Sequence, residues 1–115
     1  MNEMRKKKLL MQYKFRKPEM GVYVYECIPT GTSYIGCYHD LNARINSSKF
    51  KLMGGLHPNK NLQNDWKIYG ESNFSVRVLE ILPYDEKDET KKDYAEELEA
   101  LRHKWINKVV NSEVI

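Results

Sequence analysis

The sequence predicts an α+β domain in which helices pack against a small central sheet. Some segments alternate in side-chain polarity with the period of two that is typical of strands, and others carry apolar residues at helical spacing. In chain order we expect strands at 21–28 and 33–38, helices at 41–53 and 59–69, a strand at 74–82 and a helix at 94–109. This order favours a sheet covered by helices. A chain of 115 residues has room for one modest core.

The first two strands form a predicted hairpin with an unusual aromatic face. Pro29-Thr30-Gly31-Thr32 supplies the turn between them. Because side chains alternate along a strand, one face of the hairpin collects four tyrosines, which are Tyr23, Tyr25, Tyr34 and Tyr38. We expect some of these rings to pack in the core, while Tyr23 and Tyr34 keep their hydroxyl groups at its rim.

The next two segments read as amphipathic helices. Asp40 is a candidate N-cap, and Gly54-Gly55 ends the first helix. Its buried stripe is Leu41, Ile45 and Leu52, with Arg44 at the edge of this stripe. The second helix buries Leu62, Trp66 and Tyr69 and stops at Gly70.

The remainder of the chain predicts one more strand and one long helix. Pro83 closes the strand, and residues 84–92 form a charged loop. The last helix has an apolar stripe at spacings of 4, 7, 11 and 15, formed by Tyr94, Leu98, Leu101, Trp105 and Val109. At the other end of the chain, residues 3–14 form a predicted basic helix that ends before Pro18. We therefore divide the chain into a basic arm, 1–18, and a domain, 19–112.

Charge is unevenly distributed along the chain. Residues 1–79 hold 13 Lys/Arg against 6 Asp/Glu, whereas residues 80–115 hold 6 against 10. The basic part contains the hairpin and Arg44, which favours a partner that carries phosphate. The sequence shows no secretory signal, no membrane span and no Cys/His zinc spacing, so we expect a cytoplasmic protein with reduced thiols at Cys27 and Cys37.

The two strands carry Gly21-Val22-Tyr23 and Tyr34-Ile35-Gly36, and Arg44 follows ten residues after Tyr34. His57 opens the second helix, and an acidic last helix precedes Trp105-Ile106. Taken in this order over roughly residues 20–110, the motifs resemble the GIY-YIG nuclease family. The resemblance implies a three-stranded antiparallel sheet flanked by helices. It also implies an endonuclease that hydrolyses DNA phosphodiester bonds with a divalent metal, Mg²⁺ or Mn²⁺.

The resemblance assigns roles to individual residues. Tyr23 would act as general base or hold the attacking water, and Tyr34 would orient the phosphate or the first phenol. Arg44 would bind the scissile phosphate through its planar guanidinium. His57 would contact phosphate or carry protons, since its unperturbed pKa is near 6.5. Gly36 would leave room for close approach of the nucleic acid. Both residues also have a purely structural interpretation. An isolated arginine on such a helix is more often a surface cation, and His57 is also consistent with a residue that only begins a helix.

The expected metal ligand is missing from its position. The family places a glutamate three residues before the bulky pair, where this sequence has Arg102. A guanidinium cannot bind Mg²⁺ or Mn²⁺, which take oxygen ligands. Glu99 lies one turn earlier, about 60° around the helix, and is the alternative ligand. If Glu99 does not substitute, the chain is a catalytically inactive nucleic-acid-binding module of the same fold.

We expect duplex or branched DNA as the partner, and a protein partner could supply specificity. The residues predicted to contact nucleic acid, beside Gly36, are Lys6, Lys7, Lys8, Lys49 and Lys60. The basic arm also fits a solvated terminus. A third hypothesis is a protein-interaction domain that uses the acidic last helix and the loop 84–92.

Overall fold

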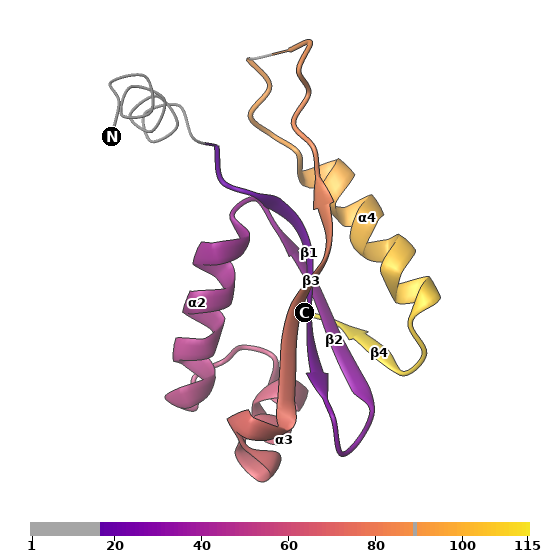
Figure 1. Cartoon of the computed structure of the whole chain (residues 1–115). Helices are drawn as coiled ribbons and strands as arrows, with labels where there is room; N and C mark the ends of the chain where they lie inside the picture. Colours follow the sequence, from indigo (N-terminus) through magenta and orange to yellow (C-terminus); the bar gives the residue numbers. More distant parts are fainter. Residues whose placement is uncertain (1–16, 89) are drawn as a thin grey trace, which may run out of the picture.

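The computed structural model describes residues 17–88 and 90–115, and its elements follow one another along the chain as Figure 1 shows. The bounds are β1 (Met20–Cys27), β2 (Thr32–Tyr38), α2 (Leu41–Met53), α3 (Lys60–Tyr69), the 3-10 helix η1 (Glu71–Asn73), β3 (Phe74–Leu82), α4 (Ala95–Lys108) and β4 (Ser112–Val114). The predicted basic helix 3–14 and most of the arm 1–18 lie outside the described residues. No helix in the described part of the chain is long and apolar enough to span a membrane.

The sheet has four strands in the order β3-β1-β2-β4. β1 is central and pairs antiparallel with β2 and with β3, whereas β4 runs parallel to β2. The prediction of a three-stranded sheet is therefore wrong, because the sheet has a fourth strand, β4. After α4 the chain turns at Asn111, whose φ is 59°, and the backbone N–H of Ile115 then donates to the carbonyl of Ile35 at 2.9 Å. A strand of three residues is too short to show a period in the sequence.

The two faces of the sheet are covered by different helices (Figure 1). The tyrosine face packs on α2 and α3, in a cluster formed by Tyr23, Tyr25, Tyr34, Leu41, Leu52, Leu62 and Trp66. The aliphatic face packs on α4, in a cluster where Val22, Val24 and Ile35 meet Leu101, Trp105, Ile106 and Val109. The predicted alternation of β1 and β2 and the predicted stripes of these helices are confirmed, except at Tyr69 of α3, which is half-buried and lies outside the cluster. This arrangement places α2 and α4 on opposite sides of β1 and β2.

Polar contacts fix both helices to the sheet. The hydroxyl of Tyr25 lies 2.5 Å from Ser48 Oγ on α2, and the pair is buried. On the other side, Trp105 Nε1 of α4 donates to Glu80 Oε1 of β3 at 2.9 Å. Because the Tyr25–Ser48 pair is buried, a shift of α2 would leave its hydroxyl groups unpaired, whereas the Trp105–Glu80 bond is partly exposed to solvent.

Gly36 has a specific packing role. It lies opposite Tyr23 in the β1–β2 ladder, and a Cβ on Gly36 would lie 2.6 Å from both Cζ and Oη of Tyr23. The ring of Tyr23 thus occupies the space that a side chain on Gly36 would fill. The room predicted for nucleic acid above Gly36 is taken by the protein's own phenol, so we correct that expectation.

We expect Gly36→Ala to destabilise the domain by about 1–3 kcal/mol, because the added methyl group overpacks a buried contact. Tyr23 is 4% exposed, so its ring cannot move aside without displacing its neighbours. The measurement is the free energy of unfolding from a denaturant titration.

Gly54→Ala is the matched control. Gly54 has ordinary helical dihedrals, with φ of −87°, and its nearest Cβ contact would be 3.6 Å. This control should change stability little. An equal effect of the two substitutions would contradict the packing role of Gly36.

Candidate functional site

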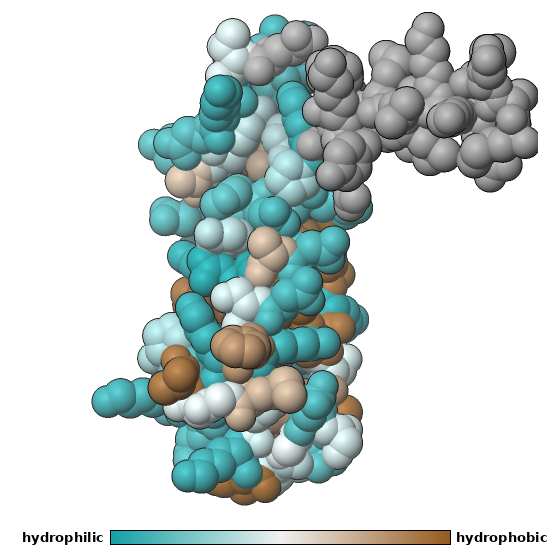
Figure 2. Space-filling view, turned by 90° about the vertical axis from the view of Figure 1, so that its left-hand side faces the viewer, coloured by the Kyte–Doolittle hydropathy of each residue, from teal (hydrophilic) through white to brown (hydrophobic). Residues whose placement is uncertain are grey.

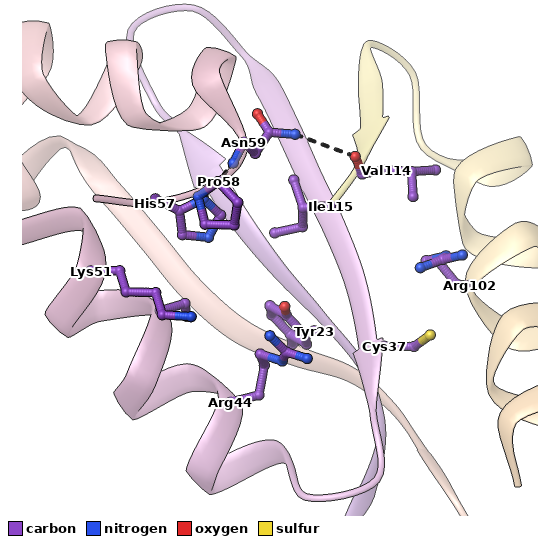
Figure 3. A pocket seen from close by; sticks show the side chains of 11 residues that line it. Tyr23, Cys37, Arg44, Lys51, His57, Pro58, Asn59, Arg102, Val114 and Ile115 are labelled. Atoms are coloured by element: carbon purple, nitrogen blue, oxygen red, sulfur yellow. Dashed lines mark hydrogen bonds between the residues drawn. The ribbon is translucent and has the colours of Figure 1, made fainter. Parts of the chain in front are cut away.

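A hollow of about 410 Å³ lies between α2, α4 and the open end of the tyrosine face. We call it the cationic hollow. It is lined by Tyr23, Cys37, Arg44, Ser48, Lys51, His57, Pro58, Asn59, Arg102, Val114 and Ile115. Figure 3 shows Arg44 and Lys51 on the α2 side, with Arg102 facing them from α4. Three of the residues predicted for the site, Tyr23, Arg44 and His57, therefore meet at one surface.

The described lining holds three permanent cations and no carboxylate side chain. Arg44 and Lys51 lie seven residues apart on α2, which puts them two turns apart on the same face. Arg102 comes from α4, on the far side of the sheet. Like charges gathered around one concavity create a strong local potential that favours an anion.

Tyr23 forms the floor of the hollow as a neutral phenol. Burial raises its pKa to about 12, although the guanidinium groups of Arg44 and Arg102 oppose this effect. The hydroxyl group is therefore protonated near neutral pH and can donate a hydrogen bond. To act as a base at that pH, Tyr23 would need a further nearby positive charge that lowers its pKa.

Arg44 is held by a stacking contact that the sequence analysis did not anticipate. Its Cζ lies 3.8 Å from the centroid of the Tyr38 ring. Asp40 caps α2 as predicted, accepting a hydrogen bond from the backbone N–H of Ala43 at 3.1 Å. Stacking on an aromatic face leaves the edge of a guanidinium free for an oxyanion.

His57 is oriented by its own loop. Its Nδ1 accepts from the backbone N–H of Asn59 at 3.0 Å, and its backbone N–H donates to Gln63 Oε1 at 2.9 Å. Burial lowers the pKa of His57, and the positive charges of Lys51 and Arg44 lower it further. Since Nδ1 accepts, the proton of the neutral ring sits on Nε2, which makes the ring a donor.

Tyr34 departs from its expected position. It is 2% exposed, and its hydroxyl donates to Asp65 Oδ2 at 2.5 Å, outside the lining of the cationic hollow. Burial and the hydrogen bond to Asp65 raise the pKa of Tyr34. The expectation that this hydroxyl stays at the rim is wrong, because α3 brings a carboxylate over it.

The predicted metal ligand also lies outside the cationic hollow. Glu99 is exposed and lines a neighbouring hollow, which shares Cys37 and Arg102 with the first. The described residues contain no group of three or more His, Cys, Asp or Glu side chains that could hold a metal ion. A lining of three cations with no carboxylate side chain does not fit a divalent metal, which requires oxygen ligands.

The predicted lysine contacts are dispersed, and the sequence analysis missed one cation that lines the hollow. Lys49 is half-buried on α2, Lys60 borders a separate groove, and Lys6, Lys7 and Lys8 lie outside the described residues. Lys51 was not predicted, although its spacing of seven from Arg44 could have indicated a shared face.

Two solved structures resemble this chain. The catalytic domain of homing endonuclease I-TevI matches with a TM-score of 0.66, over 84% of this chain and 97% of that one, at 20% identity. A mutant of the catalytic domain of intron endonuclease I-TevI gives a TM-score of 0.63, over 79% and 84%, at 21% identity. No protein-family model and no curated protein matches the sequence.

The chain has the GIY-YIG nuclease fold. At this level of identity the similarity establishes the fold alone. Within that fold, the tripeptides Gly21-Val22-Tyr23 and Tyr34-Ile35-Gly36 are the paired strands β1 and β2, as their spacing predicted. The sequence resemblance and the architecture therefore agree.

We expect an anion in the cationic hollow to raise the pKa of His57, because negative charge stabilises the imidazolium form. Without an anion, the ring should titrate below 6.5. The measurement is an NMR titration of the histidine ring protons, with and without inorganic phosphate.

His103, exposed on α4 and outside the lining, is the internal control. Its signals should not respond to phosphate. Equal responses of His57 and His103 would mean that phosphate does not bind in the hollow.

Proposed function

We propose that the cationic hollow binds a phosphodiester of DNA. The observation that carries the proposal is the donor set, in which three cations, a neutral imidazole and a neutral phenol share one lining without a carboxylate side chain. Phosphate oxygens are acceptors, and they match a lining of donors. The fold supports this proposal, since its solved neighbours are catalytic domains of an endonuclease.

Each residue has a distinct part in the proposed binding. Arg44, stacked on Tyr38, presents its planar edge to two phosphate oxygens. Arg102 approaches the same group from α4, and Lys51 adds charge without a fixed direction. His57 donates through Nε2, and Tyr23 donates its hydroxyl from the floor. None of these contacts reads a base, so binding would depend weakly on sequence.

Hydrolysis would need more than this set of donors. Neither Tyr23 nor His57 is a base in its present state, because the phenol is protonated and the free lone pair of the imidazole is occupied by Asn59. The metal that the nuclease fold implies does not fit the lining. We infer that the chain holds DNA at a nuclease-type site and that Arg102 suppresses cleavage.

Metal-dependent cleavage through Glu99 is the second candidate. The observation that favours it is the place of Glu99, which is exposed one turn before Arg102. Glu99 lines the neighbouring hollow, which shares Arg102 and Cys37 with the cationic hollow. Under this candidate the wild type nicks DNA with Mg²⁺ or Mn²⁺, and Glu99→Ala stops the reaction. A protein partner that supplies specificity fits either candidate.

Arg44→Ala should weaken binding to duplex DNA about tenfold and reduce the slope of log affinity against log salt by about one, since one phosphate contact is lost. Fluorescence anisotropy over a range of salt concentrations measures both quantities.

Arg77→Ala is the matched control for charge. Arg77 is exposed on β3, 3.6 Å from Glu26, and lies outside the cationic hollow. If both substitutions reduce affinity and slope equally, the effect comes from net charge and not from the hollow.

Arg102→Glu should create or greatly raise Mn²⁺-dependent nicking of supercoiled plasmid, because it places an oxygen ligand beside Tyr23, Arg44 and His57. Arg102→Gln removes the same positive charge without adding a carboxylate and should not nick. Nicking by the wild type that persists in Glu99→Ala would refute both accounts of the metal site.

A further inference from the structure

A second concavity, of about 670 Å³, lies between the end of α2 and the first turns of α3. We call it the α2–α3 groove, and its lining includes Met53, His57, Lys60, Trp66 and Lys67. His57 lines both this groove and the cationic hollow. A strand of nucleic acid held in the hollow can therefore continue past His57 into the groove.

The groove combines cations with an apolar wall. Lys60 and Lys67 are exposed at its border, and its described lining contains no carboxylate side chain. Met53 is 71% exposed, whereas Trp66 is 7% exposed and borders the groove from the core. Figure 2 views the molecule from the α2 side and shows apolar side chains between hydrophilic ones over the lower half, where α2 ends and α3 lies.

This lining suits a nucleotide more closely than a bare phosphate. A phosphate group needs only the cations, so an exposed methionine would add nothing to its binding. A nucleobase has an apolar face that gains by contact with such a side chain. In a continuous duplex both faces of each base are covered by its neighbours, and only an unstacked base offers a face to Met53.

We propose that the α2–α3 groove binds an unpaired nucleotide adjacent to the phosphodiester in the cationic hollow, so that the preferred ligand is DNA with a single-stranded segment next to a duplex. Lys60 and Lys67 hold the backbone of the unpaired segment, and Met53 contacts its base. The proposal rests on the function proposed above, because the hollow supplies the neighbouring phosphate contact.

The test compares two ligands that differ only in their bases. One is a duplex with a short overhang of thymidines, and the other carries abasic sites in the same overhang. For the wild type we expect the thymidine overhang to bind about two- to tenfold more tightly than the abasic one, the range of one contact between a methionine sulfur and an aromatic face. Met53→Ser should bring this ratio close to one, whereas Val110→Ser, which removes a side chain that is 88% exposed beyond α4, should leave it unchanged.

Equal affinity of the wild type for the two overhangs would overturn the proposal, because the contact would then involve phosphates alone. Equal ratios in Met53→Ser and Val110→Ser would also overturn it. The double substitution Lys60→Gln, Lys67→Gln should weaken binding of both overhangs more than the matched double substitution Lys87→Gln, Lys108→Gln, whose residues are exposed outside both cavities. An equal loss would mean that Lys60 and Lys67 act only through net charge. Failure of the cationic hollow is distinguished by a blunt duplex, whose binding depends on Arg44 and not on Met53.

Discussion

The ring of Tyr23 lies across Gly36 on the neighbouring strand, and the arrangement of the site depends on this contact. Because Gly36 has no side chain, the phenol reaches from β1 over β2 to the floor of the cationic hollow. The same ring packs edge-to-face on Tyr25, which is hydrogen-bonded to Ser48 of α2. The position of α2, and hence of Arg44 and Lys51, is thus set by the packing beneath them.

Convergence of charge is the second feature of the site. Two cations come from α2 and one from α4, and these helices cover opposite faces of the sheet. Bringing them together without a carboxylate side chain between them is unfavourable in the free protein, since like charges repel. An anion removes this repulsion when it binds, and a ligand that binds only the folded state stabilises the fold. Burial keeps Tyr23 neutral against this local positive potential. For His57, burial and the positive potential both favour the neutral ring.

Under the proposed function, Arg102 supports binding of the phosphodiester and suppresses its cleavage. A carboxylate at that position would face Arg44 across the hollow and offer oxygen to a metal ion, whereas the guanidinium offers further donors to a phosphate. Glu99 is only one turn away, but that turn places it in the neighbouring hollow. Under the proposed function, the residue at this position of α4 distinguishes a site that cuts a phosphodiester from one that only holds it.

The sequence by itself determined the elements with a clear period. The alternation of β1, the Asp40 cap and the stripes of α2 and α4 depend on local spacing, which the sequence displays directly. The tertiary structure alone decided how these elements meet. It added β4, which is too short to show a period, and it covered the hydroxyl of Tyr34 with Asp65 from α3. It also brought Arg102 to Arg44 and Lys51, residues 58 and 51 positions earlier in the chain. Such contacts depend on packing between distant segments, and no local pattern encodes them.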